Sequence, residues 1–101
     1  MNGRRTSRVQ EPAERVKGLV YVIRNIVGMC KIGHTNDLEK RMGDHRRQYL
    51  GQQLDIVLTR TVDDRYKAET KLHRHFAAKR VYREWFDLTP DDIETIKAME
   101  L

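Results

Sequence analysis

The sequence predicts a small α+β sandwich in which a central three-stranded antiparallel sheet is flanked by helices. Two observations carry this prediction: three segments rich in β-branched residues, and two intervening segments with helical periodicity. The predicted order is ββαβα, followed by a short apolar element and a C-terminal helix. With 101 residues, of which 39% are hydrophobic, the chain can build one core, and two independent domains are excluded.

The first two strands are predicted over 18–24 and 29–34, joined by a turn. The first segment, GLVYVIR, is β-branched and aromatic, which is typical of a buried strand. Tyr21 lies inside it, where a tyrosine is usually a core or half-buried residue. Gly33 lies near the end of the second strand and indicates a bulge or a close approach to the backbone.

The first helix is predicted to begin after 35–37 and to end at Gly51. We expect Asn36 to be its N-cap, because Glu39 then falls at the third helical position in a box-like arrangement. The residues that share its core-facing side are Leu38, Met42, His45 and Tyr49.

The third strand is predicted over 54–62 and, being apolar on nearly both sides, in the middle of the sheet. Asp63 and Asp64 precede the second helix, whose core stripe is Ala68, Leu72 and Phe76. Residues 79–84 are predicted to form a basic turn, and 85–88 a short apolar element. Thr89 and Pro90 open the last helix, with the proline at its first position.

The net charge of +5 is unevenly distributed. The net charge is +3 over residues 1–17, +6 over residues 18–84 and −4 over residues 85–101. Residues 1–17 are typical of a flexible basic arm, so we divide the chain into this arm and a domain over 18–101. The basic middle favours a phosphate-bearing partner such as nucleic acid, although a merely soluble basic protein has the same charge.

Several protein classes are excluded or disfavoured by composition. One cysteine excludes a disulfide scaffold and a cysteine-based zinc finger, and it agrees with a reducing cytoplasm. No apolar run approaches the ~18 residues of a membrane helix, so we expect no membrane partner. The oligomeric state is left open between a monomer and a weak dimer.

Polar residues beside the apolar stripes are candidates for chemistry. Arg41 and His45 lie one turn apart on the first helix, as do Glu69 and His73 on the second. Most such residues are simply exposed or extend to solvent along an apolar surface. Glu69 and His73 can share a metal ion, but zinc needs three or four ligands, whereas a single carboxylate with water is typical of magnesium. His34 follows a glycine at the end of the second strand. It can lie at the rim of a site or, equally well, be an exposed turn residue.

Four short motifs occur in order along the chain: LVY at 19–21, KIG at 31–33 with TNDLEKR at 35–41, AE with LH at 68–73, and EWF at 84–86. Together they resemble the GIY-YIG nuclease superfamily, and within it the T5orf172 branch related to the Mug113 proteins. The resemblance covers about residues 18–88. It implies a GIY-YIG-type domain that cleaves DNA with one Mg²⁺ or Mn²⁺ ion, in a cytoplasmic protein encoded by a bacterium or phage.

The resemblance also implies roles for individual residues. Tyr21 corresponds to the tyrosine that touches the attacking water, Arg41 to the arginine on the scissile phosphate, and Glu69 to the glutamate that holds the metal. His45 falls where many members have a histidine. Lys31 stands in place of the second motif's tyrosine, as is common in this branch, and Leu19 in place of the first motif's glycine.

These residue types suit phosphodiester hydrolysis. Tyr21 can act as general base if the charge of Lys31 or Arg41 depresses its pKa, and Arg41 can form bidentate bonds to a phosphate. His45 can orient water or shuttle a proton. All these groups must then converge beside the first helix. The predicted catalytic set is Tyr21, Lys31, Arg41, His45 and Glu69, and the predicted nucleic-acid contacts are Lys31, His34, Arg41, Lys79, Arg80 and Arg83.

Alternative interpretations stay open at this point. The departures at Leu19 and Lys31 also suit a catalytically inactive nucleic-acid-binding module of the same fold. In the basic segment 79–83, Tyr82 can stack on a base, although an exposed helix end also favours basic residues. The acidic C-terminal helix can dock on another subunit, but closing the core is its simpler role. Trp85 and Phe86 are expected to cap the core, and Glu84 to pair with an arginine.

Overall fold

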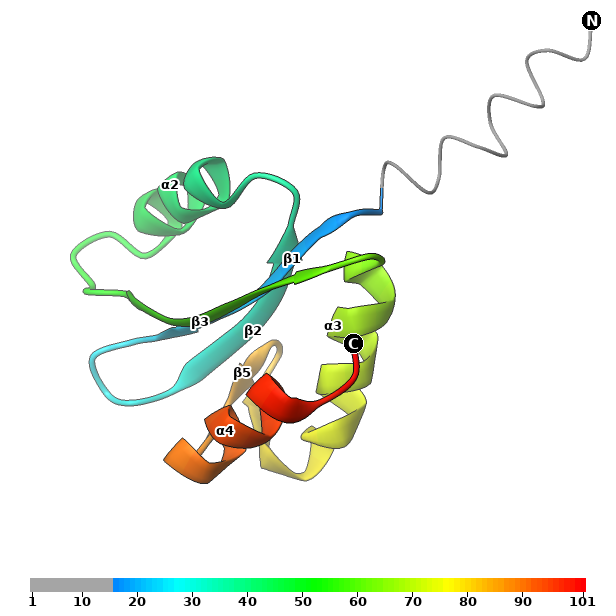
Figure 1. The fold of residues 1–101 in the computed structure, drawn as a ribbon. Helices are drawn as coiled ribbons and strands as arrows, with labels where there is room; N and C mark the ends of the chain where they lie inside the picture. Colours follow the sequence, from blue (N-terminus) through cyan, green and yellow to red (C-terminus); the bar gives the residue numbers. More distant parts are fainter. Residues whose placement is uncertain (1–15) are drawn as a thin grey trace, which may run out of the picture.

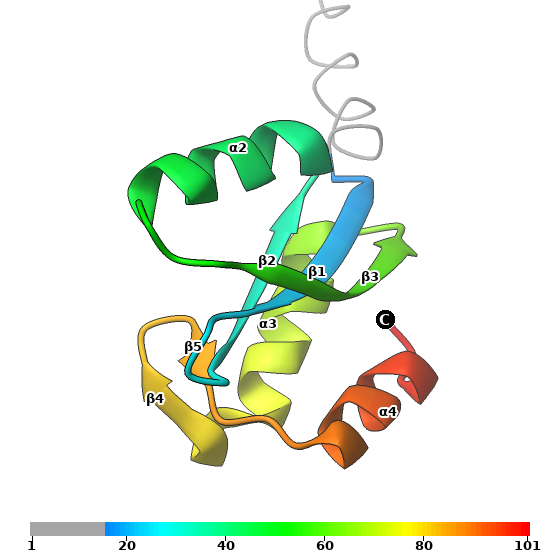
Figure 2. The same ribbon diagram turned by 90° about the vertical axis from the view of Figure 1, so that its left-hand side faces the viewer.

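The computed structural model describes residues 16–101, which form three layers (Figures 1 and 2). A sheet lies in the middle, helix α2 (Leu38–Gln48) covers one face, and helices α3 (Arg65–His75) and α4 (Pro90–Ala98) cover the other. The predicted α+β sandwich is therefore confirmed. Of the predicted arm, residues 1–15 lie outside the described part of the chain.

The sheet has five antiparallel strands in the order β3-β1-β2-β5-β4. They are β1 (Gly18–Arg24), β2 (Cys30–Thr35), β3 (Asp55–Val62), β4 (Arg80–Tyr82) and β5 (Trp85–Phe86). The prediction of three strands missed the β4–β5 hairpin, whose turn places Arg83 at φ 54. This hairpin adds to the sheet because the fully buried Phe86 pairs with Cys30, and so it depends on a partner distant in sequence.

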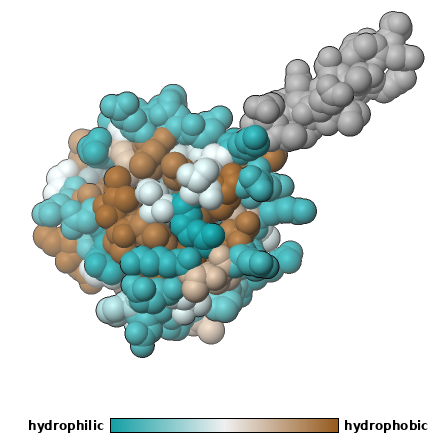
Figure 3. All heavy atoms as spheres, viewed as in Figure 1, coloured by the Kyte–Doolittle hydropathy of each residue, from teal (hydrophilic) through white to brown (hydrophobic). Residues whose placement is uncertain are grey.

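The position predicted for β3 is wrong, since β3 is an edge strand and β1 lies between β3 and β2. Apolar residues on both sides of a strand indicate that other elements cover both faces of the sheet there. They do not indicate whether the strand has a neighbouring strand on each edge. In β3 even this cover is partial, because Val57 and Leu58 are half-buried while Ile56 is 48% exposed. Figure 3 shows hydrophobic residues in the middle of one molecular face, surrounded by hydrophilic ones.

Helix α2 begins one residue later than predicted, with Asp37 rather than Asn36 as its N-cap. The Asp37 carboxylate accepts a hydrogen bond from the backbone N–H of Lys40 at 3.1 Å. Thr35 favours Asp37 as the N-cap, because the Thr35 hydroxyl accepts a hydrogen bond from the Asp37 backbone N–H at 3.0 Å. The predicted helix-ending glycine, Gly51, has φ +80 in the turn that follows.

The other two helices begin where the sequence predicts. Asp64 caps α3, and Thr89 caps α4 in a full capping box with Asp92. A short 3-10 helix, Ala77–Lys79, connects α3 to β4. At the end of α4, the Arg60 guanidinium donates to the backbone carbonyls of Ile96 and Met99. Within residues 16–101 no helix is long and apolar enough to cross a membrane.

Alternation along β1 divides the core into two clusters. Val20 and Val22 face α3 and α4 and belong to the larger cluster, whose helix residues include the predicted Ala68, Leu72 and Phe76. Tyr21 and Ile23 face the opposite way and pack with Met42 of α2. The alternation thus places the Tyr21 side chain in the layer of α2, where the polar residues of that helix also lie.

Candidate functional site

One polar pocket of about 240 Å³ brings together all five residues predicted to be catalytic. It also includes the predicted contact His34. The remaining lining residues, which the site prediction did not contain, are Gly33, Gln48 and Glu84. Residues from β1, β2, α2, α3 and the β4–β5 turn therefore meet at one place, although they are spread over most of the domain.

The pocket lies where the edge of β2 is open. Strand β5 pairs with Cys30 and Lys31, and the Ile32 backbone N–H donates to the Glu84 carbonyl at 3.2 Å. Beyond these contacts, no strand within residues 16–101 pairs with β2 on that side. Helix α3 lies along this edge, and the His73 ring Nε2–H donates to the Ile32 carbonyl at 3.0 Å. Glu69 reaches the pocket from α3 around this edge, whereas Arg41 and His45 reach it from α2.

Tyr21 and His45 form a buried hydrogen-bonded pair, with 2.8 Å between the Tyr21 Oη and the His45 Nε2. Both residues are almost fully buried, at 2% and 4% exposed. The Tyr21 ring crosses the backbone of β2 directly at Gly33, where a Cβ atom would lie 2.3 Å from the phenol oxygen. The close approach predicted at Gly33 is thus confirmed, and its cause is the tyrosine ring.

Burial determines the protonation state of this pair. Burial raises the pKa of Tyr21 well above its ordinary value, and the opposing charge of Arg41 does not compensate. Burial, together with the charges of Lys31 and Arg41, lowers the pKa of His45. The condition under which Tyr21 could act directly as general base, a depressed pKa, is therefore not met: at neutral pH the phenol keeps its proton and the imidazole is uncharged.

Lys31 does not contribute to the shift of the Tyr21 pKa, and its ammonium group forms an ion pair with Glu84. Its ammonium group lies 2.7 Å from a carboxylate oxygen of Glu84, and the Lys31 side chain is only 11% exposed. Burial alone would raise the pKa of Glu84, but the hydrogen bond and charge of Lys31 outweigh it and hold that pKa below its usual value. Glu84 was expected to pair with an arginine, and no local signal identifies a lysine 53 residues away as its partner.

Glu69 has the environment of a carboxylate that lacks its counter-ion. Within residues 16–101 its side chain makes no hydrogen bond or ion pair, and it is half-buried. Burial raises its pKa, and the nearby negative charge of Glu84 adds to the shift, while His73, Lys31 and Arg41 oppose it. A divalent cation bound here would relieve this unfavourable desolvation.

The donor set distinguishes between metals. The described residues contain no group of three or more His, Cys, Asp or Glu side chains that could hold an ion, which does not fit a zinc site. His73, the second ligand considered above, is engaged at both ring nitrogens, by the Ile32 carbonyl and by the Arg80 guanidinium at 3.3 Å. The residues present fit Mg²⁺ or Mn²⁺ held by Glu69, with water and phosphate oxygens completing the shell.

Arg41 of α2 and His34 of β2 also line the pocket. The Arg41 guanidinium is exposed and, in the described part of the chain, makes no ion pair, which leaves its donors available for an anion. Burial and the charges of Arg65 and Arg41 lower the pKa of His34. The His34 ring packs on the Tyr66 ring with 4.5 Å between centroids.

The basic segment 79–83 lies outside this pocket and is mostly paired. Lys79 forms an ion pair with Asp92, and Arg80 contacts His73 and the ring of Phe86. Arg83 donates to the Tyr82 hydroxyl at 2.8 Å. Two of the three cations predicted to bind nucleic acid there line depressions that adjoin the pocket. Arg83 lines one of about 420 Å³, which shares Lys31, Gln48 and Glu84 with the pocket. Arg80 lines another of about 400 Å³, which shares Glu69 with it.

The fold and the pocket together define a GIY-YIG-like domain, with a tyrosine on the first strand, an arginine on the following helix and a glutamate on the next. The family model of the T5orf172 domain matches residues 18–99, and the chain therefore belongs to the T5orf172 domain family. This makes it a nuclease-like or nucleic-acid-binding module. Among curated proteins and among solved structures, none matches this chain.

Proposed function

We propose that this domain is a metal-dependent endonuclease that hydrolyses phosphodiester bonds in DNA, using one Mg²⁺ or Mn²⁺ ion held by Glu69. The observation that carries the proposal is the convergence in one pocket of three features: an arginine and a carboxylate that form no ion pair within residues 16–101, and a buried Tyr–His pair. Phosphodiester hydrolysis needs each of these: charge neutralisation on the phosphate, a metal-binding group and a proton acceptor for the attacking water.

The Tyr21–His45 pair acts as a two-step proton acceptor. A protonated phenol cannot accept a second proton. Tyr21 must therefore give its hydroxyl proton to the neutral His45 Nε2 as it accepts a proton from the attacking water. The hydroxide attacks phosphorus, the bond to the leaving oxygen breaks, and solvent protonates that oxygen. This relay explains why an uncharged histidine beside a protonated tyrosine suits the chemistry.

The remaining residues neutralise and position charge. Arg41 binds two oxygens of the scissile phosphate through its guanidinium fork. Glu69 would hold the divalent cation, which when bound stabilises negative charge on the phosphate and the leaving oxygen as a Lewis acid. The ion pair between Lys31 and Glu84 lines the pocket, and Lys31 occupies the position of a tyrosine in the second motif.

Nicking of supercoiled plasmid in Mg²⁺ or Mn²⁺ tests the proposal. We expect Glu69→Gln and Tyr21→Phe each to lower nicking by about 100-fold or more, because each removes one catalytic group. Tyr21→Phe keeps the ring over Gly33 and therefore the packing. Glu94→Gln is the matched control, because this carboxylate lies on α4, paired with Lys97. A wild-type protein that never nicks, or equal nicking by Glu69→Gln, contradicts the proposal.

A catalytically inactive nucleic-acid-binding module is the second candidate. The high pKa of Tyr21 and the commitment of Lys31 to Glu84 favour it, because neither group is then free to act alone. Its signature is salt-sensitive DNA binding without cleavage. The two functions are separated by the plasmid assay run beside a binding assay, since DNA that is bound but never cut supports the second.

A further inference from the structure

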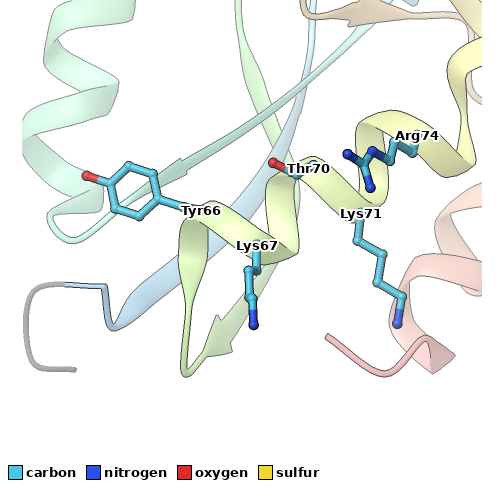
Figure 4. A pocket seen from close by; sticks show the side chains of 5 residues that line it. All are labelled: Tyr66, Lys67, Thr70, Lys71 and Arg74. Carbon is cyan, nitrogen blue, oxygen red and sulfur yellow. The ribbon is translucent and has the colours of Figure 1, made fainter. Parts of the chain in front are cut away.

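The outward side of α3 carries a second groove that the proposed chemistry does not use. It has a volume of about 550 Å³, and all its lining residues lie on this one helix (Figure 4). We call it the outer α3 groove, and its lining residues are Tyr66, Lys67, Thr70, Lys71 and Arg74. In Figure 4 the side chains of Lys67 and Lys71 extend from the helix to the same side.

The charge of this groove is entirely positive. All five lining residues are exposed, three are cations and none is a carboxylate. In the part of the chain that the structure describes, the Lys67 and Arg74 side chains make no ion pair, and Lys71 donates only to the backbone carbonyl of Glu100. The positive charge is therefore not neutralised within residues 16–101.

This arrangement is unfavourable for the helix by itself. Like charges at i,i+4 and i,i+3, such as Lys67 with Lys71 and Lys71 with Arg74, destabilise a helix. The dipole of α3 is already compensated, because the Asp64 carboxylate caps its positive end and accepts from the Lys67 backbone N–H. A polyanion bound in the groove would offset the repulsion among the three cations.

The outer α3 groove is continuous with the pocket around Glu69. A depression of about 400 Å³ between them shares Glu69 with the pocket, and Thr70 and Arg74 with the outer α3 groove. A second connection runs through Tyr66, whose ring contacts the ring of the pocket residue His34. At about 100° per residue, Glu69, Thr70 and Arg74 follow one another around the helix surface.

We infer that the outer α3 groove binds the sugar–phosphate backbone of the nucleic acid on one side of the phosphate that Arg41 contacts. Lys67, Lys71 and Arg74 neutralise successive phosphates, and the strand crosses α3 at Thr70 and Arg74 before it reaches Glu69. The inference rests on the proposed function for the position of the scissile phosphate. It adds a binding surface on α3 to the contacts predicted at 79–83, of which Arg80 lines the connecting depression.

Salt-dependent DNA binding tests this surface without requiring cleavage. The probe is a fluorescein-labelled 30-bp duplex of mixed sequence, measured by anisotropy in EDTA with a Glu69→Gln protein, across a series of KCl concentrations. The variant replaces Lys67, Lys71 and Arg74 by glutamine. A control that removes the same net charge replaces Arg24, Arg46 and Lys97, none of which lines the pocket, the connecting depression or the outer α3 groove.

We expect the groove variant to bind DNA about tenfold or more weakly than its parent. The slope of log K against log salt should fall in magnitude by about 2–3, because each of the three lost phosphate contacts contributes ~0.9. The control should change the slope by less than about 1. Thermal unfolding checks that both proteins fold. Arg74→Gln alone, which should lower the slope by about 1, provides the test if the triple variant does not fold.

Equal losses in the two triple variants would overturn the inference, because net charge alone would then explain binding. No loss in the groove variant would also overturn it, as would a polyglutamate peptide that binds the wild-type groove as tightly as DNA does. Failure of the nuclease proposal looks different: plasmid is never nicked, yet the groove variant still binds DNA more weakly than its control. The two proposals can therefore fail separately.

Discussion

Substitution of Gly33 by alanine should move the central tyrosine of the pocket. A Cβ atom at this position would lie 2.3 Å from the Tyr21 phenol oxygen and 2.5 Å from its ring carbon Cζ. Ordinary contacts are about 3.5 Å or longer, so the ring or the strand must shift by about 1 Å. Such overpacking of a buried site costs about 1–3 kcal/mol, which corresponds to a melting temperature lower by about 5–15 °C.

The same shift should affect chemistry more than stability. A misplacement of about 1 Å in a catalytic group can cost 100-fold in rate, so Gly33→Ala should reduce plasmid nicking by about that factor. Gly43→Ala is the matched control, because its Cβ would meet nothing closer than Arg47 Nη1 at 3.8 Å. In mid-helix that change should stabilise by about 0.5–1 kcal/mol. Wild-type stability and nicking in Gly33→Ala would refute the close-packing argument.

Other predictions address stability and its pH dependence. Because burial raises the Glu69 pKa, stability is lost as pH rises from 4.5 through the folded value, so Glu69→Gln should raise the metal-free melting temperature at pH 7.5. Mg²⁺ should raise this temperature in wild type and not in Glu69→Gln. Burial lowers the His45 pKa, so denaturant midpoints should fall as pH drops below 6.5, and fall less in His45→Gln. Arg60→Met should destabilise by about 1–3 kcal/mol, since two carbonyls lose their donor, yet leave DNA binding unchanged in an anisotropy titration.

Local patterns were sufficient for the elements that depend on nearby residues. The hairpin of β1 and β2, the three helices, and the start of α4 at Thr89 and Pro90 all follow from spacing and capping chemistry, which act within a few residues. Gly33 was also recognised as a site of close approach. The N-cap of α2 was placed one residue early, because a side-chain hydrogen bond from Thr35 decides between two adjacent capping residues.

Long-range contacts were beyond the reach of such patterns. The β4–β5 hairpin is too short to show periodicity, and it forms because Phe86 is buried against β2. The pairing of Lys31 with Glu84 joins residues 53 positions apart, and the Tyr21–His45 hydrogen bond spans 24. Burial then set the pKa of Tyr21 in the direction opposite to the one expected from nearby charges alone.

The sequence alone determined the elements, since alternation and periodicity place Arg41 and Glu69 beside the apolar stripes of their helices and Tyr21 inside a strand. The motifs' resemblance to the GIY-YIG superfamily then indicated which of these residues belong to the site. Only the tertiary structure decided how these elements meet. The short β5 leaves part of the β2 edge open, and α3 brings Glu69 around that edge into the layer of α2. The protonation of the site follows from this packing, since desolvation depends on which groups the fold excludes from water.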